Sequence, residues 1–383
     1  MKGGTFLKFL LVLLLIAAGL YLYVSIQLGP YGKGGTVYIP KGASVQQTAE
    51  ILKQGGILRS AWAFRGLARW RGVQAKLKPG EYQFEAGMTS REVLDKIVRG
   101  DRVIRRLVVP EGSSFAQIAA LIEKAGIAPQ AETMKFFRDP ALLAGLGFPA
   151  VSLEGYLFPA AYEYDRETAA EGLLRQMLKK FQDSIRGTIA DRAKQSGWTI
   201  PQVVTLASII EKETGLAAER PLISSVFHNR LRIGMPLQTD PTVIYGLPNF
   251  DGNLRKEDLR NPHAYNTYVH VGLPPGPIAS PGLASLEAAL SPAASNYLFF
   301  VAKGDGSHFF SATLDEHNAA VARYQLGRAP SPAAPGPETR PAPTAAPAAP
   351  SPVMKPVPMP RAPLPAPTPG PTRPLMKPVP MPR

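Results

Sequence analysis

The sequence predicts an α+β protein with one N-terminal transmembrane helix before the folded part and a disordered Pro-rich tail after it. Three observations support this prediction. An uncharged apolar run covers residues 9–28, strand–turn–helix units repeat between residues 36 and 127, and proline becomes frequent after Gly327. The 383 residues also leave room for two domains of ordinary size.

The apolar run has the properties of a membrane anchor. It comprises about 20 residues, which matches the thickness of a bilayer core, and Gly29 and Pro30 follow it. Lys2 and Lys8 precede the run, so the positive-inside rule places the rest of the chain outside the cytoplasm. The alternative is a signal peptide cleaved near Ala17–Gly19, but the apolar run continues well beyond that point.

Two strand–turn–helix units follow, 70 positions apart (Pro110 minus Pro40). Each begins with a short β-rich strand and a Pro/Gly turn. Each continues with a serine that can cap a helix (Ser44, Ser114) and an amphipathic helix closed by glycine. A weaker third copy covers residues 82–100.

Residues 36–85 predict the order strand, helix, helix, strand, with the second helix at 62–70 and the last strand at 81–84. This order resembles a LysM-like module, a small fold that binds wall glycans. Strand–turn–helix units are also common scaffolding, so the sequence leaves glycan binding by this module open.

Composition excludes several kinds of chemistry. The chain has no cysteine, so it has no disulfide, thiolate nucleophile or Cys-ligated metal. HExxH, G-x-S-x-G and Walker A motifs are absent, and the five histidines lack ligand spacing, so we expect no metal and no cofactor. The net charge of +14 favours polyanions or anionic surfaces. Nucleic-acid-binding motifs are absent, so we expect no nucleic-acid partner. A dispersed basic surface or a wall polymer with carboxylates would explain the charge.

The tail has a biased composition. After Gly327, proline alternates with Ala, Thr, Met and Val, and Met354–Arg361 is copied at Met376–Arg383. Such a segment cannot bury a core, so it is predicted to be disordered with polyproline II character. It is either a solvated spacer or a tether to the wall or to a partner.

The most informative stretch is a helix that begins at Ile200–Pro201 and ends with the run Glu211–Gly215. On a helical wheel, Glu211 and Glu213 lie on opposite borders of its apolar stripe. Each is half-sheltered, so burial can raise the pKa of either carboxyl group. The wheel does not choose between them, and two solvated glutamates at a helix end are the plainer interpretation.

Polar segments rich in amides, hydroxyls and aromatic rings follow this helix, and such groups suit a sugar site. The candidate substrate-binding residues are Gln238, Thr239, Asp240, Tyr265, Asn266 and Tyr268. Asp240, before Pro241, can instead be only a turn residue, and the tyrosines can be only core. His308 is the histidine best placed for function, although a structural role is the plainer interpretation.

The run Leu206–Thr214, with the sequence LASIIEKET, is similar to the signature helix of the YceG-like endolytic murein transglycosylases. The resemblance covers roughly residues 36–325 and does not extend to the tail. Further motifs occur in the family's order at Leu153–Pro159, Asn229–Leu231, Leu237–Gly246, Ala264–Tyr268 and Gly272–Ile278.

The resemblance implies a single-pass protein of the bacterial inner membrane whose catalytic domain lies in the periplasm. It implies cleavage of the MurNAc–GlcNAc bond within glycan strands, which leaves 1,6-anhydro-MurNAc ends and stops the elongation of nascent strands. It also implies Glu211, the first glutamate of the Glu-Lys-Glu set, as the single acid/base. The implied partners are peptidoglycan glycan strands, the inner membrane and peptidoglycan synthases.

These interpretations divide the chain into five segments. We predict a cytoplasmic N-terminus at 1–8, a transmembrane helix at 9–28, a LysM-like module at 36–100, a YceG-like catalytic domain at 101–327 and the tail at 328–383.

Two alternative functions stay open. One is a non-catalytic peptidoglycan-binding membrane anchor. The other is a two-carboxylate muramidase, a hydrolase that would pair Glu211 with Glu154 or Asp240, because ordinary glycosidases use two carboxylates.

Overall fold

A computed structural model describes residues 3–327, and the predicted tail lies outside the described residues. The described chain is α+β, as predicted: it combines helices with three two-stranded antiparallel sheets. It forms two compact units. The first comprises the described residues up to Arg186 together with Ala279–Leu283, and the second comprises Gly187–Ile278 together with the described residues from Ala284. The predicted boundary between residues 100 and 101 stays a prediction.

Helix α1 (Gly3–Leu28) contains the apolar run. Its segment Lys8–Leu28 is long and apolar enough to cross a membrane, and none of that segment is buried. A signal sequence passes the same test of length and composition, so the retained anchor is taken up below as a proposal.

The predicted order for residues 36–85 is confirmed. It comprises β1 (Gly35–Ile39), α2 (Val45–Gln54), α3 (Ala61–Trp70) and β2 (Gly80–Phe84), with α4 (Ser90–Arg99) after it. β1 pairs antiparallel with β2, and Val37 lies opposite Tyr82. The helices and this two-stranded sheet share one core, which includes Phe64, Tyr82, Phe84, Leu94 and Ile97.

The second repeat unit has the same local design. β3 (Arg105–Val108) is followed by α5 (Phe115–Lys124), and β3 pairs with β4 (Ala161–Tyr164). Ser44 and Ser114 cap their helices, as the sequence predicts, and each also forms a capping box with the glutamine three residues later. The first compact unit also contains α6 (Gln130–Met134), α7 (Pro140–Ala144), α8 (Ala170–Ile185) and the 3₁₀ turns Gln74–Lys76, between α3 and β2, and Lys135–Arg138.

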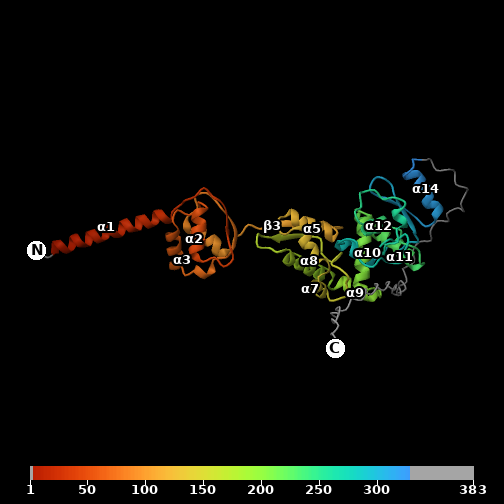
Figure 1. Cartoon of the computed structure of the whole chain (residues 1–383), viewed down its shortest axis with the longest axis horizontal. Helices are drawn as coiled ribbons and strands as arrows, with labels where there is room; N and C mark the ends of the chain where they lie inside the picture. Colours follow the sequence, from red (N-terminus) through yellow and green to blue (C-terminus); the bar gives the residue numbers. More distant parts are fainter. Residues whose placement is uncertain (1–2, 328–383) are drawn as a thin grey trace, which may run out of the picture. The chain divides into compact units, whose positions relative to one another are not determined.

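The second unit is built around α10 (Ile200–Glu213), where every residue from Gln202 to Ile210 is buried. The predicted one-sided stripe is therefore an underestimate, because neighbours cover α10 on all sides. α11 (Arg220–Arg232) and α12 (Asp240–Gly246) both pack against it (Figure 1). The other elements are α9 (Thr188–Gln195), α13 (Leu283–Leu290), β5 (Phe299–Ala302), β6 (His308–Ser311), α14 (Leu314–Tyr324) and the 3₁₀ turns Ala217–Glu219 and Asp258–Arg260.

Candidate active site

A cavity of about 540 Å³ lies in the second unit, where the end of α10 meets the turn before α12 and the β5–β6 hairpin. Its lining combines carboxylates, amides, a guanidinium, imidazoles and aromatic rings. The lining residues are Glu213, Arg230, Gln238, Asp240, Tyr268, Phe299, Phe300, Val301, Ala302, His308, Leu314, His317, Asn318, Val321 and Gln325.

Glu213 is the last residue of α10, and its half-buried side chain lines the cavity. Burial raises the pKa of Glu213 to about 7. A hydrogen bond with the side chain of Thr239 is the largest influence in the opposite direction. The negative charge of Asp240 also raises the pKa, and the positive charges of His308 and Arg230 lower it. Glu213 is therefore a carboxyl group that can both hold and release a proton near neutral pH.

Glu211 lies in different surroundings. Its side chain is only 6 % exposed, and its Oε1 lies 3.1 Å from a guanidinium nitrogen of Arg220. Arg220 also donates to the hydroxyl of Ser285 at 3.1 Å. Glu211 is not among the residues that line the cavity. The structure thus separates the two carboxyl groups, and it places the one that the resemblance favoured in a buried ion pair.

The turn Gln238–Thr242 brings polar groups to the cavity, and Thr267 holds it in place. The Thr267 carbonyl accepts from the backbone of Gln238 at 3.0 Å, and its hydroxyl accepts from the backbone of Thr239 at 3.1 Å. That hydroxyl also shares a 2.8 Å hydrogen bond with Thr242. Gln238 has φ of 50°, a left-handed conformation that is uncommon for a residue with a side chain. Such strain persists only where surrounding contacts enforce it.

Tyr268, in the loop that follows Asn266, contacts this turn through its side chain. Its hydroxyl donates to Asp240 at 2.6 Å. Burial, with the hydrogen bond and charge of Asp240, raises the pKa of Tyr268, so the phenol stays protonated at neutral pH. The pair leaves the other oxygen of Asp240 as an acceptor for a ligand.

The structure brings only some of the predicted substrate-binding residues together. Gln238, Asp240 and Tyr268 line the cavity, whereas Thr239, Tyr265 and Asn266 do not. Asn266 is fully buried, and its amide nitrogen donates to three backbone carbonyls, the nearest of them at 2.7 Å on Asn261. Thr239 is 2 % exposed, and Tyr265 packs its ring on Tyr245, with 4.8 Å between centroids. These residues shape the loops behind the cavity.

Several residues that line the cavity were not predicted as site residues from the sequence. Arg230 was named only within the motif Asn229–Leu231, with no role. Its side chain donates to the Leu298 carbonyl at 2.7 Å and, through a second nitrogen, to the Leu237 carbonyl at 2.6 Å. It thus links the turn before α12 to the start of β5. Phe299 and Phe300 come from a short strand, and nothing in their local sequence distinguishes them from core. Glu154, the other suggested carboxylate, is buried and accepts from the backbone of Phe115.

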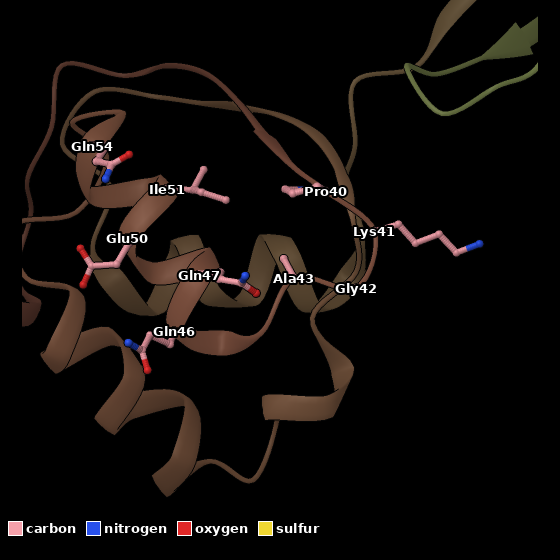
Figure 2. Close-up of a pocket in the computed structure, with 9 residues that line it drawn as sticks. All are labelled: Pro40, Lys41, Gly42, Ala43, Gln46, Gln47, Glu50, Ile51 and Gln54. Carbon is pink, nitrogen blue, oxygen red and sulfur yellow. The ribbon is translucent and has the colours of Figure 1, made fainter.

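A second cavity, of about 390 Å³, lies in the N-terminal module. Figure 2 shows its nine lining residues, four from the turn after β1 and five from α2. The turn is closed by a hydrogen bond from Ala43 to the Pro40 carbonyl and contains Gly42 at φ of 81°. Gln46, Gln47, Glu50 and Gln54 supply amide and carboxylate groups.

The cavity in the second unit suits acid/base chemistry on a carbohydrate. It holds one carboxyl group that titrates near neutrality, hydrogen-bonding groups of both kinds, and flat rings against which a sugar can stack. No cluster of three or more His, Cys, Asp or Glu residues suited to a metal occurs within residues 3–327.

Comparison with known proteins points to one family. Residues 37–323 match the model of the YceG-like family. The endolytic murein transglycosylase of Bacillus subtilis (strain 168) is 35 % identical over 330 residues, which cover 81 % of this chain and 91 % of the relative. The endolytic murein transglycosylase of Streptococcus pneumoniae serotype 2 (strain D39 / NCTC 7466) is 29 % identical, over 83 % of this chain and 64 % of the relative.

The fold has a solved counterpart. The 2.6 Å crystal structure of a yceG-like protein from Listeria monocytogenes aligns with a TM-score of 0.54 at 34 % sequence identity. The alignment covers 75 % of this chain and 98 % of the other chain.

Proposed function

The chain belongs to the YceG-like family, and we propose from this premise that it is an endolytic murein transglycosylase. It cleaves the MurNAc–GlcNAc bond within peptidoglycan strands and leaves 1,6-anhydro-MurNAc ends. The observation that carries the chemistry is the carboxyl group of Glu213, which lines a polar, ring-walled cavity and has its pKa raised to about 7.

We propose Glu213, rather than Glu211, as the acid/base. In the first half of the reaction, its carboxyl proton passes to the leaving oxygen of GlcNAc as the bond to C1 of MurNAc breaks. In the second half, its carboxylate takes the proton of the MurNAc 6-hydroxyl, whose oxygen bonds to C1. The nucleophile belongs to the substrate and the proton returns to Glu213, so one carboxyl group can serve where a hydrolase needs two.

The neighbours of Glu213 support the same reaction. Gln238, Asp240 and Tyr268 are proposed substrate contacts, because they line the cavity and carry amide, carboxylate and phenol groups. Asp240 also adds negative charge that raises the pKa of Glu213. Thr239, Tyr265 and Asn266 are assigned instead to the support of these loops, and Glu211 to the ion pair with Arg220.

Helix α1 extends the proposal to the cell envelope. α1 would stay in the inner membrane as a single-pass anchor, with the two folded units in the periplasm, because positive charges precede its apolar run. Cleavage beside the membrane would stop the elongation of new strands, which makes peptidoglycan synthases the expected protein partners.

The N-terminal module is proposed to be LysM-like and to hold glycan in the α2 cavity. The support is the observed strand–helix–helix–strand order together with the amide-rich lining (Figure 2). Replacing Gln46 and Glu50 by Ala should weaken cosedimentation with insoluble peptidoglycan by several-fold. Unchanged cosedimentation of this folded variant would contradict the proposal.

Product chemistry tests the main proposal. The full chain, in detergent, should convert purified glycan strands to fragments that end in 1,6-anhydro-MurNAc. Reducing ends would indicate a hydrolase that pairs Glu213 with Asp240, the other carboxylate of the cavity. Binding without cleavage by wild-type protein would favour the non-catalytic anchor.

A further inference from the structure

Glu219 and His308 form a hydrogen-bonded pair at the edge of the Glu213 cavity. One Glu219 oxygen accepts from the backbone N–H of His308 at 2.8 Å, and the other contacts Nδ1 of its ring at 2.7 Å. Both side chains are largely sheltered, at 13 % and 12 % exposure. A carboxylate that uses both oxygens on one histidine holds the position of its backbone and the orientation of its ring.

The ionisation of Glu219 requires a hydrogen on Nδ1 of the His308 ring. Burial tends to raise its pKa, but the hydrogen bonds and charge of His308 lower it, and the pKa lies below the ordinary value. Glu219 is thus a carboxylate at neutral pH and can only accept hydrogen bonds. Nδ1 must therefore carry a hydrogen that it donates to Glu219, which leaves Nε2 as the ring nitrogen that can contact a ligand.

The placement of the pair connects it to the reaction. His308 lines the same cavity as Glu213, and its ring meets that of Phe300 edge to face, with 5.5 Å between centroids. Glu219 also accepts from the hydroxyl of Thr214, the residue next to Glu213, at 3.4 Å. One carboxylate thus links the end of α10 to the start of β6 on two sides of the cavity.

We propose that His308 contacts the bound glycan through Nε2, which forms a hydrogen bond with a sugar hydroxyl, and that Glu219 is its positioning residue. The inference rests on the proposed function, since it assigns a ligand group to the same cavity. It adds a substrate contact from β6 to those proposed for the turn that carries Gln238 and Asp240.

Two amide substitutions of His308 distinguish a contact with substrate from a purely structural hydrogen bond with Glu219. In His308→Asn, the amide nitrogen can take the place of Nδ1 and keep the bond to Glu219, but nothing replaces Nε2. In His308→Gln, the amide reaches the place of Nε2 but does not restore the bond to Glu219. A substrate contact requires His308→Asn to be the less active variant, although it is the more stable one.

The experiment uses the full chain and purified glycan strands, with release of anhydro ends as the readout. His308→Asn should lose about tenfold in kcat/KM, mainly through KM, with thermal unfolding close to wild type. Glu219→Gln should also lose activity, and the double variant Glu219→Gln/His308→Asn should be no worse than His308→Asn alone, because Glu219 acts through His308. Asp251→Asn, which breaks an exposed ion pair with Arg255, is the matched control and should retain wild-type activity.

Activity of His308→Asn equal to wild type would overturn the proposal, as would activities that follow stability across the variants. Fully additive losses in the double variant would overturn the positioning role of Glu219. Failure of the proposed function is distinguishable from all of these outcomes, because in that case the wild-type chain itself would release no anhydro ends.

Discussion

Glu211 and Glu213 are separated by one residue on α10, and their surroundings differ completely. Glu211 is paired with Arg220 in the protein interior, whereas Glu213 lines a cavity that a ligand can enter. A catalyst that gives and retrieves a proton needs a pKa near the working pH and access to substrate. Glu213 combines both properties, with a pKa of about 7.

Glutamine substitutions should separate the roles of the two glutamates. Glu213→Gln should abolish turnover, with a loss of at least about 10⁴ in kcat, because the amide can neither donate nor retrieve the proton. Glu211→Gln should keep its chemistry but lose roughly 1–3 kcal/mol of stability, because Arg220 stays buried without its carboxylate partner. Anhydro-muropeptide release and thermal unfolding should be measured on both variants. A folded, inactive Glu211→Gln beside an active Glu213→Gln would reverse the assignment.

The raised pKa of Glu213 predicts the pH dependence of activity. The reaction begins with the protonated carboxyl group, so kcat/KM should be constant at low pH and fall as the pH rises through about 7. Initial rates at subsaturating glycan between pH 5 and 9 would measure this. A rate that instead rises through pH 7 would mean that the essential form of Glu213 is the carboxylate.

The same shift predicts how stability depends on pH. The folded state binds this proton more tightly than the unfolded chain, whose pKa is near the ordinary 4.5. The stabilisation is therefore present below pH 4.5 and is lost as the pH rises to about 7. Glu213→Gln does not titrate, so its stability relative to wild type should improve over this window by roughly 3 kcal/mol. Denaturant unfolding at pH 4.5 and pH 8 tests this prediction, and a difference that is the same at both pH values would contradict it.

At the scale of elements, the cavity depends on a turn that local sequence does not stabilise by itself. Gln238 adopts a left-handed conformation, and Thr267, which is 1 % exposed, supplies the hydrogen bonds that hold the turn. The β5–β6 side is held by Arg230 in the same manner, through contacts with backbone carbonyls on two segments.

Removing the hydroxyl of Thr267 should therefore damage both stability and activity. Thr267→Val is close to isosteric, but it leaves the buried N–H of Thr239 without its acceptor, at a cost of about 1–3 kcal/mol. The displaced turn would also carry Asp240 away from Glu213 and lower kcat/KM. Urea unfolding and initial rates measure the two effects, and Thr267→Ser, which keeps the hydroxyl, is the control. Wild-type stability of Thr267→Val would show that the turn does not depend on this residue.

At the scale of the whole molecule, the proposed retention of α1 in the membrane would determine where the chemistry takes place. A reporter enzyme that is active only outside the cytoplasm, fused after Gly327, should be active and should remain in the membrane fraction. The reason is that Lys2 and Lys8 precede an unbroken apolar run. A soluble product that lacks its N-terminus would instead show that the run is a cleaved signal.

Local patterns were sufficient for much of the fold, because capping and hydrophobic periodicity act between residues close in sequence. The apolar helix, the helix-capping serines Ser44 and Ser114, the strand order around α2 and α3, and the helix that carries Glu211 and Glu213 could all be predicted in this way. The family could also be inferred, because its motifs are continuous runs. The burial of α10 on all sides could not be predicted, since the neighbours that cover its polar face are distant in the chain.

The identity of the site residues needed the tertiary structure. A helical wheel shows that Glu211 and Glu213 point in different directions, but it cannot show that Arg220 meets one and that Asp240, Tyr268 and the β5–β6 hairpin surround the other. Burial and the arrangement of charges set the pKa of a carboxyl group. Both are produced by segments that are far apart in sequence and adjacent only in the folded chain.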